Sequence, residues 1–393
     1  MLYSDFQNLK LSKLGFGTMR LPLREDGSID ERRTEEMVRY AMENGINYFD
    51  TAYPYHSGKS ELVIGKALSA YPRKSFYLAD KYPGHQISES YDPAATFEEQ
   101  LRKCGVDYFD FYLLHNVCEK SYGVYTDPKW GIIDYFAEQK RRGRIRHLGF
   151  SSHAGIENLR EFLDRYGELM EFCQIQLNYL DWTLQDAKTK VELLTERNIP
   201  VWVMEPVRGG KLAKLPQAGE DALKRLRPDE SPAAWCFRWL ADIPQVKVIL
   251  SGMSSLAQMQ ENICTMSAEK PLNAEERQTL SDIADGLTRC VPCTGCRYCC
   301  DGCPMGLDIP MLLASYNDAK FAPNFTVGMR LDSLPEEQRP TACVGCGACA
   351  QICPQKIDIP GVMQDFAEIM KTLPDWTAIC REREAAANAL KNG

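Results

Sequence analysis

The stretch CTGCRYCCDGCP, residues 293–304, returns fifty residues later as CVGCGACAQICP, residues 343–354. In each copy, three cysteines follow one another at every third position, and a fourth cysteine comes four positions later with a proline directly behind it. Ten of the 16 cysteines lie between Cys290 and Cys353. The chain therefore divides into a cysteine-poor body, residues 1–286, and a cysteine-dense tail, residues 287–393.

The spacing C-x2-C-x2-C-x3-C-P is that of bacterial ferredoxins, in which three thiolates of one loop bind a [4Fe–4S] cluster and the cysteine before proline binds the other cluster. Two such runs predict two [4Fe–4S] clusters with crossed ligands. We expect one cluster on Cys293, Cys296, Cys299 and Cys353, and the other on Cys303, Cys343, Cys346 and Cys349.

A second register fits the same cysteine spacing, with Cys290, Cys293, Cys296 and Cys300 as ligands. It ends in Asp301 rather than proline and does not recur fifty residues on, so we rank it lower and expect Cys290 and Cys300 to be spare thiols. Two zinc ribbons are the other alternative, but zinc sites usually use two separated cysteine pairs.

The body alternates short apolar, β-rich runs with helical patterns. Strands are predicted at 14–19, 47–50, 76–81, 108–115, 147–152, 173–177, 201–205 and 246–251. Helices are predicted at 31–44, 60–70, 94–104, 132–142, 155–165, 182–197, 232–240 and 255–266. Eight strand–helix units in about 270 residues are typical of an α/β fold, the (β/α)8 TIM barrel.

Four reactive side chains stand at or just after predicted strand ends, where such barrels place their working residues. Asp50 ends the second strand and Tyr55 follows it, Lys81 ends the third strand, and His115 ends the fourth. A tyrosine has a pKa near 10, but Lys81 can lower the pKa of Tyr55 and Asp50 can keep Lys81 charged. With His115 positioning a carbonyl oxygen, the group can protonate an alkoxide as hydride reaches carbon.

These residues resemble aldo-keto reductases over about residues 8–265. The resemblance rests on GFGTM at 15–19, DTAYPY at 50–55 with Glu61 and Gly65 after it, Lys81, His115, and LGFSS at 148–152. It implies a barrel with NADPH or NADH bound in an extended form over its mouth. It also implies a catalytic tetrad of Asp50, Tyr55, Lys81 and His115.

The same resemblance implies which residues bind the cofactor. Gly17, Thr18, Met19 and Asp50 would line it, Ser151, Ser152 and Gln174 would hold its carboxamide, and Met204 would pack at the nicotinamide. Pro206, Val207, Gly209, Lys211 and Leu212 would contact the pyrophosphate, and Ser251, Gly252, Gln258, Glu261 and Asn262 the adenosine end.

Three positions depart from the family pattern. Ser152 replaces the usual asparagine, and Met204 stands where an aromatic residue often stacks on nicotinamide. Gly252, Met253 and Gln258 replace the basic residues of NADP-selective members. Because a phosphate dianion without arginine or lysine is poorly held, NADPH is not favoured over NADH.

In the tail, apolar residues at helical spacing predict helices at 309–319 and 360–371, and 382–390 is expected to close the chain as a helix. A C-P pair followed by D-I-P and a helix resembles the α-helical ferredoxin domains attached to larger oxidoreductases. The whole chain thus resembles aldo-keto reductases of bacteria and archaea with a C-terminal, mainly helical ferredoxin-like domain.

Three functions remain open. The first is a nicotinamide-dependent oxidoreductase that reduces an aldehyde or ketone to an alcohol, or the reverse, with Tyr55 as general acid and the clusters as electron carriers or redox sensors. The second is a cluster-coupled reductase that draws electrons from an external carrier. The third is a nicotinamide-binding, redox-sensing interaction module with little turnover. The paired presence of Lys81 and Tyr55 favours the first two.

The balance of 46 basic and 54 acidic residues gives a formal charge of −8, which argues against nucleic acid as a partner. The one basic cluster, residues 140–146, is expected between a helix end and a strand as a solvated face. No apolar run reaches the length of a membrane span and the N-terminus lacks secretory features, so we expect a cytoplasmic protein. The expected partners are a small-molecule carbonyl compound and a redox partner protein.

Overall fold

The computed structural model describes residues 1–86, 90–287, 291–293, 295–321 and 325–392. Cys290 therefore lies outside the described residues. The chain forms two compact units. One, the barrel unit, contains Met1–Tyr179, Ala187–Leu280 and the residues from Arg381 onward, and the other, the cysteine unit, contains Leu180–Asp186 and Ser281–Cys380.

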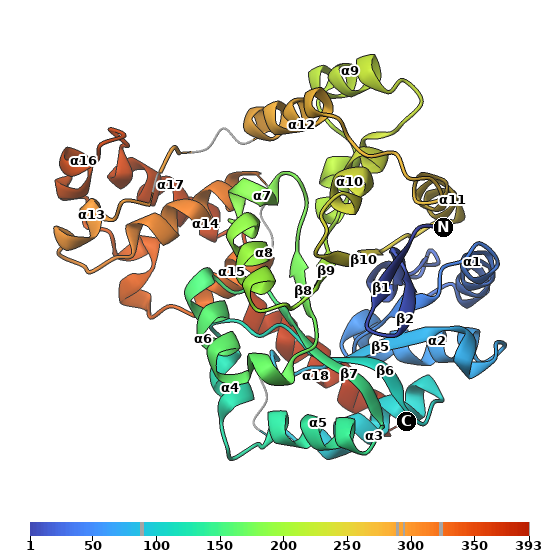
Figure 1. Ribbon diagram of the computed structural model, residues 1–393. Helices are drawn as coiled ribbons and strands as arrows, with labels where there is room; N and C mark the ends of the chain where they lie inside the picture. The colour runs from blue at the N-terminus through green and yellow to red at the C-terminus, as the bar shows by residue number, and fades with distance from the viewer. Residues whose placement is uncertain (87–89, 288–290, 294, 322–324, 393) are drawn as a thin grey trace. The chain divides into compact units, whose positions relative to one another are not determined.

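The barrel unit is built on eight parallel strands that close in the order β10-β3-β4-β5-β6-β7-β8-β9 (Figure 1). They are β3 (Leu14–Gly17), β4 (Tyr48–Asp50), β5 (Tyr77–Tyr82), β6 (Phe109–Leu114), β7 (Ile145–Ser152), β8 (Cys173–Gln176), β9 (Val201–Met204) and β10 (Val246–Ser251). Each predicted strand corresponds to one of these, so the expected (β/α)8 barrel is confirmed.

Helices follow the strands as expected. They are α1 (Glu31–Glu43), α2 (Ser60–Leu68), α3 (Pro93–Cys104), α5 (Ile132–Arg141), α6 (Ile156–Tyr166), α8 (Ala187–Glu196), α10 (Pro232–Ala241) and α11 (Leu256–Thr265). Several begin at a side-chain cap: Asp30, Asp92, Ser231 and Ser255 each accept a hydrogen bond from the backbone N–H three residues on. The helix expected at 182–197 is divided into α7 (Asp181–Leu184) and α8, because Asp186 has a left-handed backbone with φ of 50°.

An antiparallel hairpin, β1 (Tyr3–Phe6) and β2 (Leu9–Ser12), directly precedes the first barrel strand and was not predicted. Phe6 and Leu11 are buried in one cluster with Phe111 and Trp202. The Phe6 and Trp202 rings meet edge to face, with centroids 5.1 Å apart. The hairpin therefore completes the barrel core. Further helices outside the eight strand–helix units are α4 (Tyr122–Thr126), α9 (Gln217–Leu226) and α12 (Ala274–Leu287).

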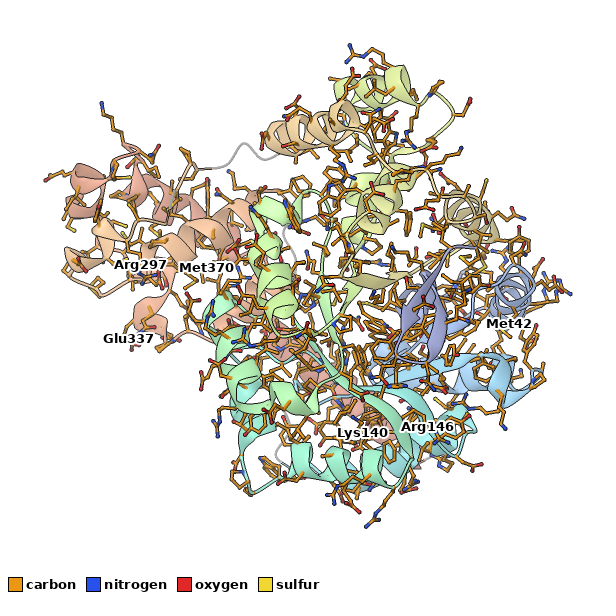
Figure 2. The ribbon with its side chains drawn as sticks, viewed as in Figure 1. Met42, Lys140, Arg146, Arg297, Glu337 and Met370 are labelled. Atoms are coloured by element: carbon orange, nitrogen blue, oxygen red, sulfur yellow. The ribbon has the colours of Figure 1, made fainter. Side chains whose placement is uncertain are left out.

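The basic cluster spans the end of α5 and the start of β7, as expected. Lys140 and Arg146 are labelled in Figure 2. Lys140 pairs with Glu171 at 2.6 Å, and Arg144 pairs with Glu98 at 2.5 Å. Acidic neighbours thus neutralise part of this cluster.

The cysteine unit is helical, and its described residues contain no strand. It contains α7, the end of α12, α13 (Tyr298–Asp301), α14 (Ile309–Phe321), α15 (Phe325–Asp332), α16 (Ala348–Ile352), α17 (Ile359–Met370) and the start of α18 (Trp376–Asn392). Leu312, Leu313, Met363 and Phe366 from α14 and α17 form the centre of a buried core. The prediction of a mainly helical tail is confirmed.

Gly65 offers a test of how tightly the barrel helices pack. A Cβ atom at Gly65 would lie 2.5 Å from the carbonyl oxygen of Cys104, at the end of α3. Because backbone cannot give way cheaply, Gly65→Ala is expected to lower the free energy of unfolding by about 1–3 kcal/mol. Urea unfolding under anaerobic conditions measures this.

The matched control is Gly123→Ala in α4, where the new Cβ has no neighbour within 4 Å. That substitution should leave stability unchanged or raise it by about 0.4–1 kcal/mol. Equal effects of the two variants would contradict the close approach of α2 to α3.

Candidate active site

The four predicted catalytic residues come from three neighbouring strands. Asp50 ends β4, Lys81 lies near the end of β5, and His115 directly follows β6. Tyr55 begins the short helix η2 (Tyr55–Gly58) in the loop after β4. Since these strands are adjacent and parallel, their carboxyl ends meet at one rim of the barrel. The structure brings all four residues to that rim.

Lys81 connects the group. Its buried ammonium donates hydrogen bonds to Asp50 Oδ1 at 2.5 Å, to the Thr51 carbonyl oxygen at 2.7 Å and to the Tyr55 hydroxyl at 3.4 Å. A lysine ammonium has three N–H donors, so each one has an acceptor. The Tyr55 hydroxyl is thereby fixed beside a buried cation.

The pKa values of these groups follow from burial and from that cation. Burial is the largest single influence on the pKa of Lys81 and would lower it, but Asp50, Tyr55 and Asp80 together outweigh burial and the pKa is raised. Burial raises the pKa of Tyr55, and Lys81 lowers it only in part. Lys81 therefore acts on Tyr55 in the expected direction, but burial has the larger effect, so Tyr55 is protonated at neutral pH.

His115 lies against this group and is neutral. Its ring and the Tyr55 ring meet edge to face, with centroids 5.9 Å apart. Burial, with the nearby charges of His85 and Lys81, holds the pKa of His115 well below its ordinary value. A neutral imidazole can donate one hydrogen bond to a carbonyl oxygen.

Two further residues near the site were missed from the sequence. The His85 ring, in the loop after β5, has its centroid 4.2 Å from that of His115, and burial lowers the pKa of His85 to about 3. The second residue is Arg383, whose charge lowers the pKa of Tyr55, His85 and His115. For each of these three groups, burial has a larger effect on the pKa than Arg383 has. His85 could have been predicted near the site, because it is only four residues beyond Lys81. Arg383 could not, because it is distant from the other site residues in the sequence.

The three residues expected to hold a nicotinamide carboxamide differ in whether their hydrogen-bonding groups are already used within the fold. Gln174, in β8, is buried, and its Oε1 has no hydrogen-bond partner among the described residues. The Ser151 hydroxyl accepts a hydrogen bond from Asn116 N at 2.8 Å and keeps its own hydrogen to donate. The Ser152 hydroxyl donates to Val117 O and accepts from Ala154 N. Gln174 and Ser151 therefore fit a carboxamide, whereas the Ser152 hydroxyl is already engaged.

The other expected cofactor residues gather at the carboxyl ends of β3, β9 and β10, which are neighbours in the barrel. They are Gly17, Thr18, Met19, Met204, Pro206, Val207, Gly209, Lys211, Leu212, Ser251, Gly252, Gln258, Glu261 and Asn262. Four are engaged within the fold: Thr18 Oγ1 donates to Asp50 O, Asn262 Nδ2 donates to Ser251 Oγ, and Gln258 Oε1 accepts from Ser254 N.

The structure adds to the expected Lys211 a second basic residue in this region, near Gly252, where the sequence suggested none. The Arg20 side chain comes within 3.3 Å of a Cβ placed at Gly252, and its guanidinium comes within 3.4 Å of one placed at Gly209. Its position directly after the GFGTM segment was the available signal.

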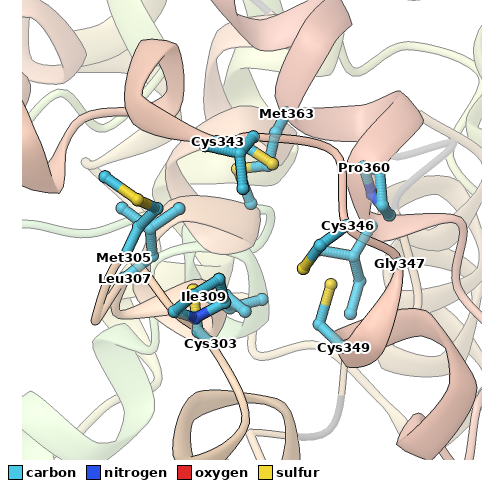
Figure 3. A pocket seen from close by; sticks show the side chains of 13 residues that line it. Cys303, Met305, Leu307, Ile309, Cys343, Cys346, Gly347, Cys349, Pro360 and Met363 are labelled. Carbon is cyan, nitrogen blue, oxygen red and sulfur yellow. The ribbon is translucent and has the colours of Figure 1, made fainter.

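In the cysteine unit, eight cysteines surround two cavities. Cys293, Cys296, Cys299 and Cys353 line the first cavity. Cys303, Cys343, Cys346 and Cys349 line the second cavity, which Figure 3 shows with their side chains around it. These are the two crossed sets expected from the spacing, and all of these thiols are free of disulfides. Cys300 lines neither cavity.

A closed parallel barrel with a buried lysine–aspartate–tyrosine group at its mouth, in one chain with a helical unit that carries two cysteine-lined cavities, is the architecture of a redox enzyme. The sequence matches the Aldo/keto reductase family over residues 13–285 and a 4Fe-4S dicluster domain over residues 292–357. The chain belongs to the aldo/keto reductase family and is an oxidoreductase of its NAD(P)H-dependent type.

Several relatives have been named or solved. The chain is 25% identical over 327 residues to an NADH-specific methylglyoxal reductase of Escherichia coli, covering 72% of this chain and 97% of the relative. It is 30% identical to the holo form of an aldo-keto reductase from Bacillus halodurans, covering 72% of this chain and 96% of that one, with a TM-score of 0.58. A Klebsiella pneumoniae aldo-keto reductase in complex with NADPH, 20% identical over 72% of this chain and 96% of its own with a TM-score of 0.58, shares the fold.

None of the described helices is long and apolar enough to cross a membrane.

If Tyr55 supplies the proton, Tyr55→Phe should lower kcat for carbonyl reduction about 10²–10⁴-fold. Because burial raises the pKa of Tyr55 and lowers that of His115, the wild-type rate should stay flat from about pH 6 to 9 and fall only at higher pH. Lys81→Met removes the cation that lowers the pKa of Tyr55, so its lower rate should decline at still higher pH. Steady-state rates against pH measure both effects.

Tyr53→Phe is the control, because Tyr53 is a buried neighbour whose hydroxyl faces Glu99 rather than Lys81. Its rate should stay within about threefold of wild type. A Tyr55→Phe enzyme as active as Tyr53→Phe would show that another group supplies the proton.

Proposed function

We propose that this enzyme reduces a small aldehyde or ketone to an alcohol, or catalyses the reverse, with Tyr55 as general acid. The observation that carries the proposal is the complete set of hydrogen bonds from Lys81 to Asp50, Thr51 and Tyr55. A buried cation with every donor used cannot turn away from the phenol, so the Tyr55 hydroxyl is held with its proton free to be donated.

The proton steps follow from this arrangement. Neutral His115 donates a hydrogen bond to the carbonyl oxygen and orients it toward Tyr55. Tyr55 gives its proton to that oxygen as negative charge develops there, and Lys81 stabilises the phenolate left behind. Asp50 keeps Lys81 charged throughout, because removing it would leave a buried cation unpaired.

A nicotinamide cofactor, NADH or NADPH, would supply the hydride. The unpartnered Oε1 of buried Gln174 can accept from the carboxamide, and the Ser151 hydroxyl can donate to it. The rim residues of β3, β9 and β10, with Arg20 among them, would bind the phosphates and the adenosine end. Arg20 supplies a cation for a phosphate, which removes the main reason to disfavour NADPH.

We further propose that the tail, residues 287–393, holds two [4Fe–4S] clusters, one in each cavity. Four free thiols around each cavity, with three from one motif and one from the other, are the ligands such a cluster uses. The clusters would carry or sense single electrons beside the hydride chemistry of the barrel. We also propose a cytoplasmic location and a redox partner protein.

The experiment that tests this function is an anaerobic titration of the purified full chain. Iron and sulfide are counted, the visible spectrum is followed while NADH and then NADPH are added, and aldehydes and ketones are tested as substrates. We expect about eight irons per chain, turnover of a carbonyl compound, and a cluster spectrum that the nucleotides leave unchanged.

The other outcomes separate the alternatives. Bleaching of the cluster spectrum by either nucleotide would favour the cluster-coupled relay. Nucleotide binding without turnover of any carbonyl compound would favour the redox-sensing module. An iron content of about four or less would overturn the proposal of two clusters.

A further inference from the structure

The two cysteine cavities are copies of one another. Each residue that lines the first cavity, shifted by the fifty residues between the motifs, falls on a residue that lines the second. The pairs include Pro310 with Pro360 and the four cysteines of each set. The cavities are therefore related by the internal repeat, and their differences show where the repeats have diverged.

The backbone around the cavities repeats as closely as the residues do. Gly295 and Gly345 both have left-handed backbones, with φ of 69° and 67°. The next such position holds Arg297 in the first motif and Gly347 in the second, with φ of 64° and 78°. A non-glycine residue in this conformation costs about 1 kcal/mol, so Arg297 occupies a position that the backbone would more readily give to glycine.

Where the residues that line the two cavities differ in polarity, the more polar residue lines the first cavity. Arg297 lines the first cavity where the second has Gly347, and Gln355 lines the first where the second has Met305. Figure 3 shows Met305 and Gly347 beside the second cavity. The other substitutions exchange apolar residues: Leu313 with Met363, and Ile357 with Leu307. At both positions, a residue whose side chain carries N–H groups belongs to the lining of the first cavity, and its counterpart at the second has no such side chain.

Arg297 lines the first cavity and forms an ion pair with an acidic side chain. Its guanidinium lies 3.2 Å from Asp308, and the two side chains are 59% and 41% exposed. Of this ion pair, only the arginine belongs to the lining of the first cavity, and solvent moderates the effect of its charge without cancelling it.

Cations and N–H donors favour the reduced form of an iron–sulfur cluster, because reduction adds negative charge to the cluster and its thiolates. We propose that Arg297 and Gln355 give the first cavity's cluster the higher reduction potential. When the two clusters together hold one added electron, that electron then passes from the second cluster to the first. The step transfers one electron, with no bond made or broken and no proton moved. It rests on the proposed function, in which both cavities hold a [4Fe–4S] cluster.

The test is an anaerobic dithionite titration of the full chain, followed by electron paramagnetic resonance at fixed potentials. We expect two midpoint potentials at least about 59 mV apart, which is a tenfold preference of one electron for the first cluster. Arg297→Gly with Gln355→Met, which copies the second cavity, should lower the higher midpoint and leave the lower one in place. The reciprocal pair, Gly347→Arg with Met305→Gln, should raise the lower midpoint.

Leu313→Met is the matched control, since it copies an apolar difference and should move neither midpoint. Gln355→Met alone keeps the test available if the double variant does not fold. With about eight irons per chain in every variant, an unmoved higher midpoint in Arg297→Gly with Gln355→Met would overturn the proposal. An iron content of about four or less in the wild type would instead overturn the two-cluster function on which it rests.

Discussion

The site depends on one buried ion pair, that of Lys81 with Asp50, whose side chains are 0% and 3% exposed. Removing one partner of such a pair costs about 3–5 kcal/mol, because a charge is left buried without compensation. The partners come from adjacent strands, with Asp50 paired to Ala79 two residues before Lys81. The closed barrel fixes that register, and the register places the ammonium under Tyr55. Barrel closure, the ion pair and the position of the Tyr55 hydroxyl therefore depend on one another.

The cysteine unit follows a different constraint. Each cavity takes three cysteines from one motif and one from the other, so neither motif forms a complete set alone. Cys299 and Cys349 are buried in the same apolar core that joins α14 and α17. The two repeats must therefore fold together before either cavity exists.

Much of this could be predicted from the sequence, because parallel strands place their last residues at one rim and cysteine spacing fixes which thiols share a loop. The hairpin containing Phe6 could not, since two four-residue strands give no periodic signal. The engagement of Ser152 depends on the carbonyl of Val117, which only the folded loop brings near. The position of Arg20 depends on the geometry of the segment after β3, and that of Arg383 on contact between residues far apart in the sequence. Neither position can be read from the sequence alone.

The central claim is that the barrel transfers hydride to a carbonyl carbon while Tyr55 supplies the proton. The most direct test is turnover in ordinary water with nicotinamide cofactor that carries deuterium at the transferable position. The alcohol product is then analysed by mass spectrometry. The account predicts one deuterium on the carbinol carbon per turnover, with clusters intact. Product without deuterium would mean that electrons arrive singly and hydrogen comes from water, which would contradict the account.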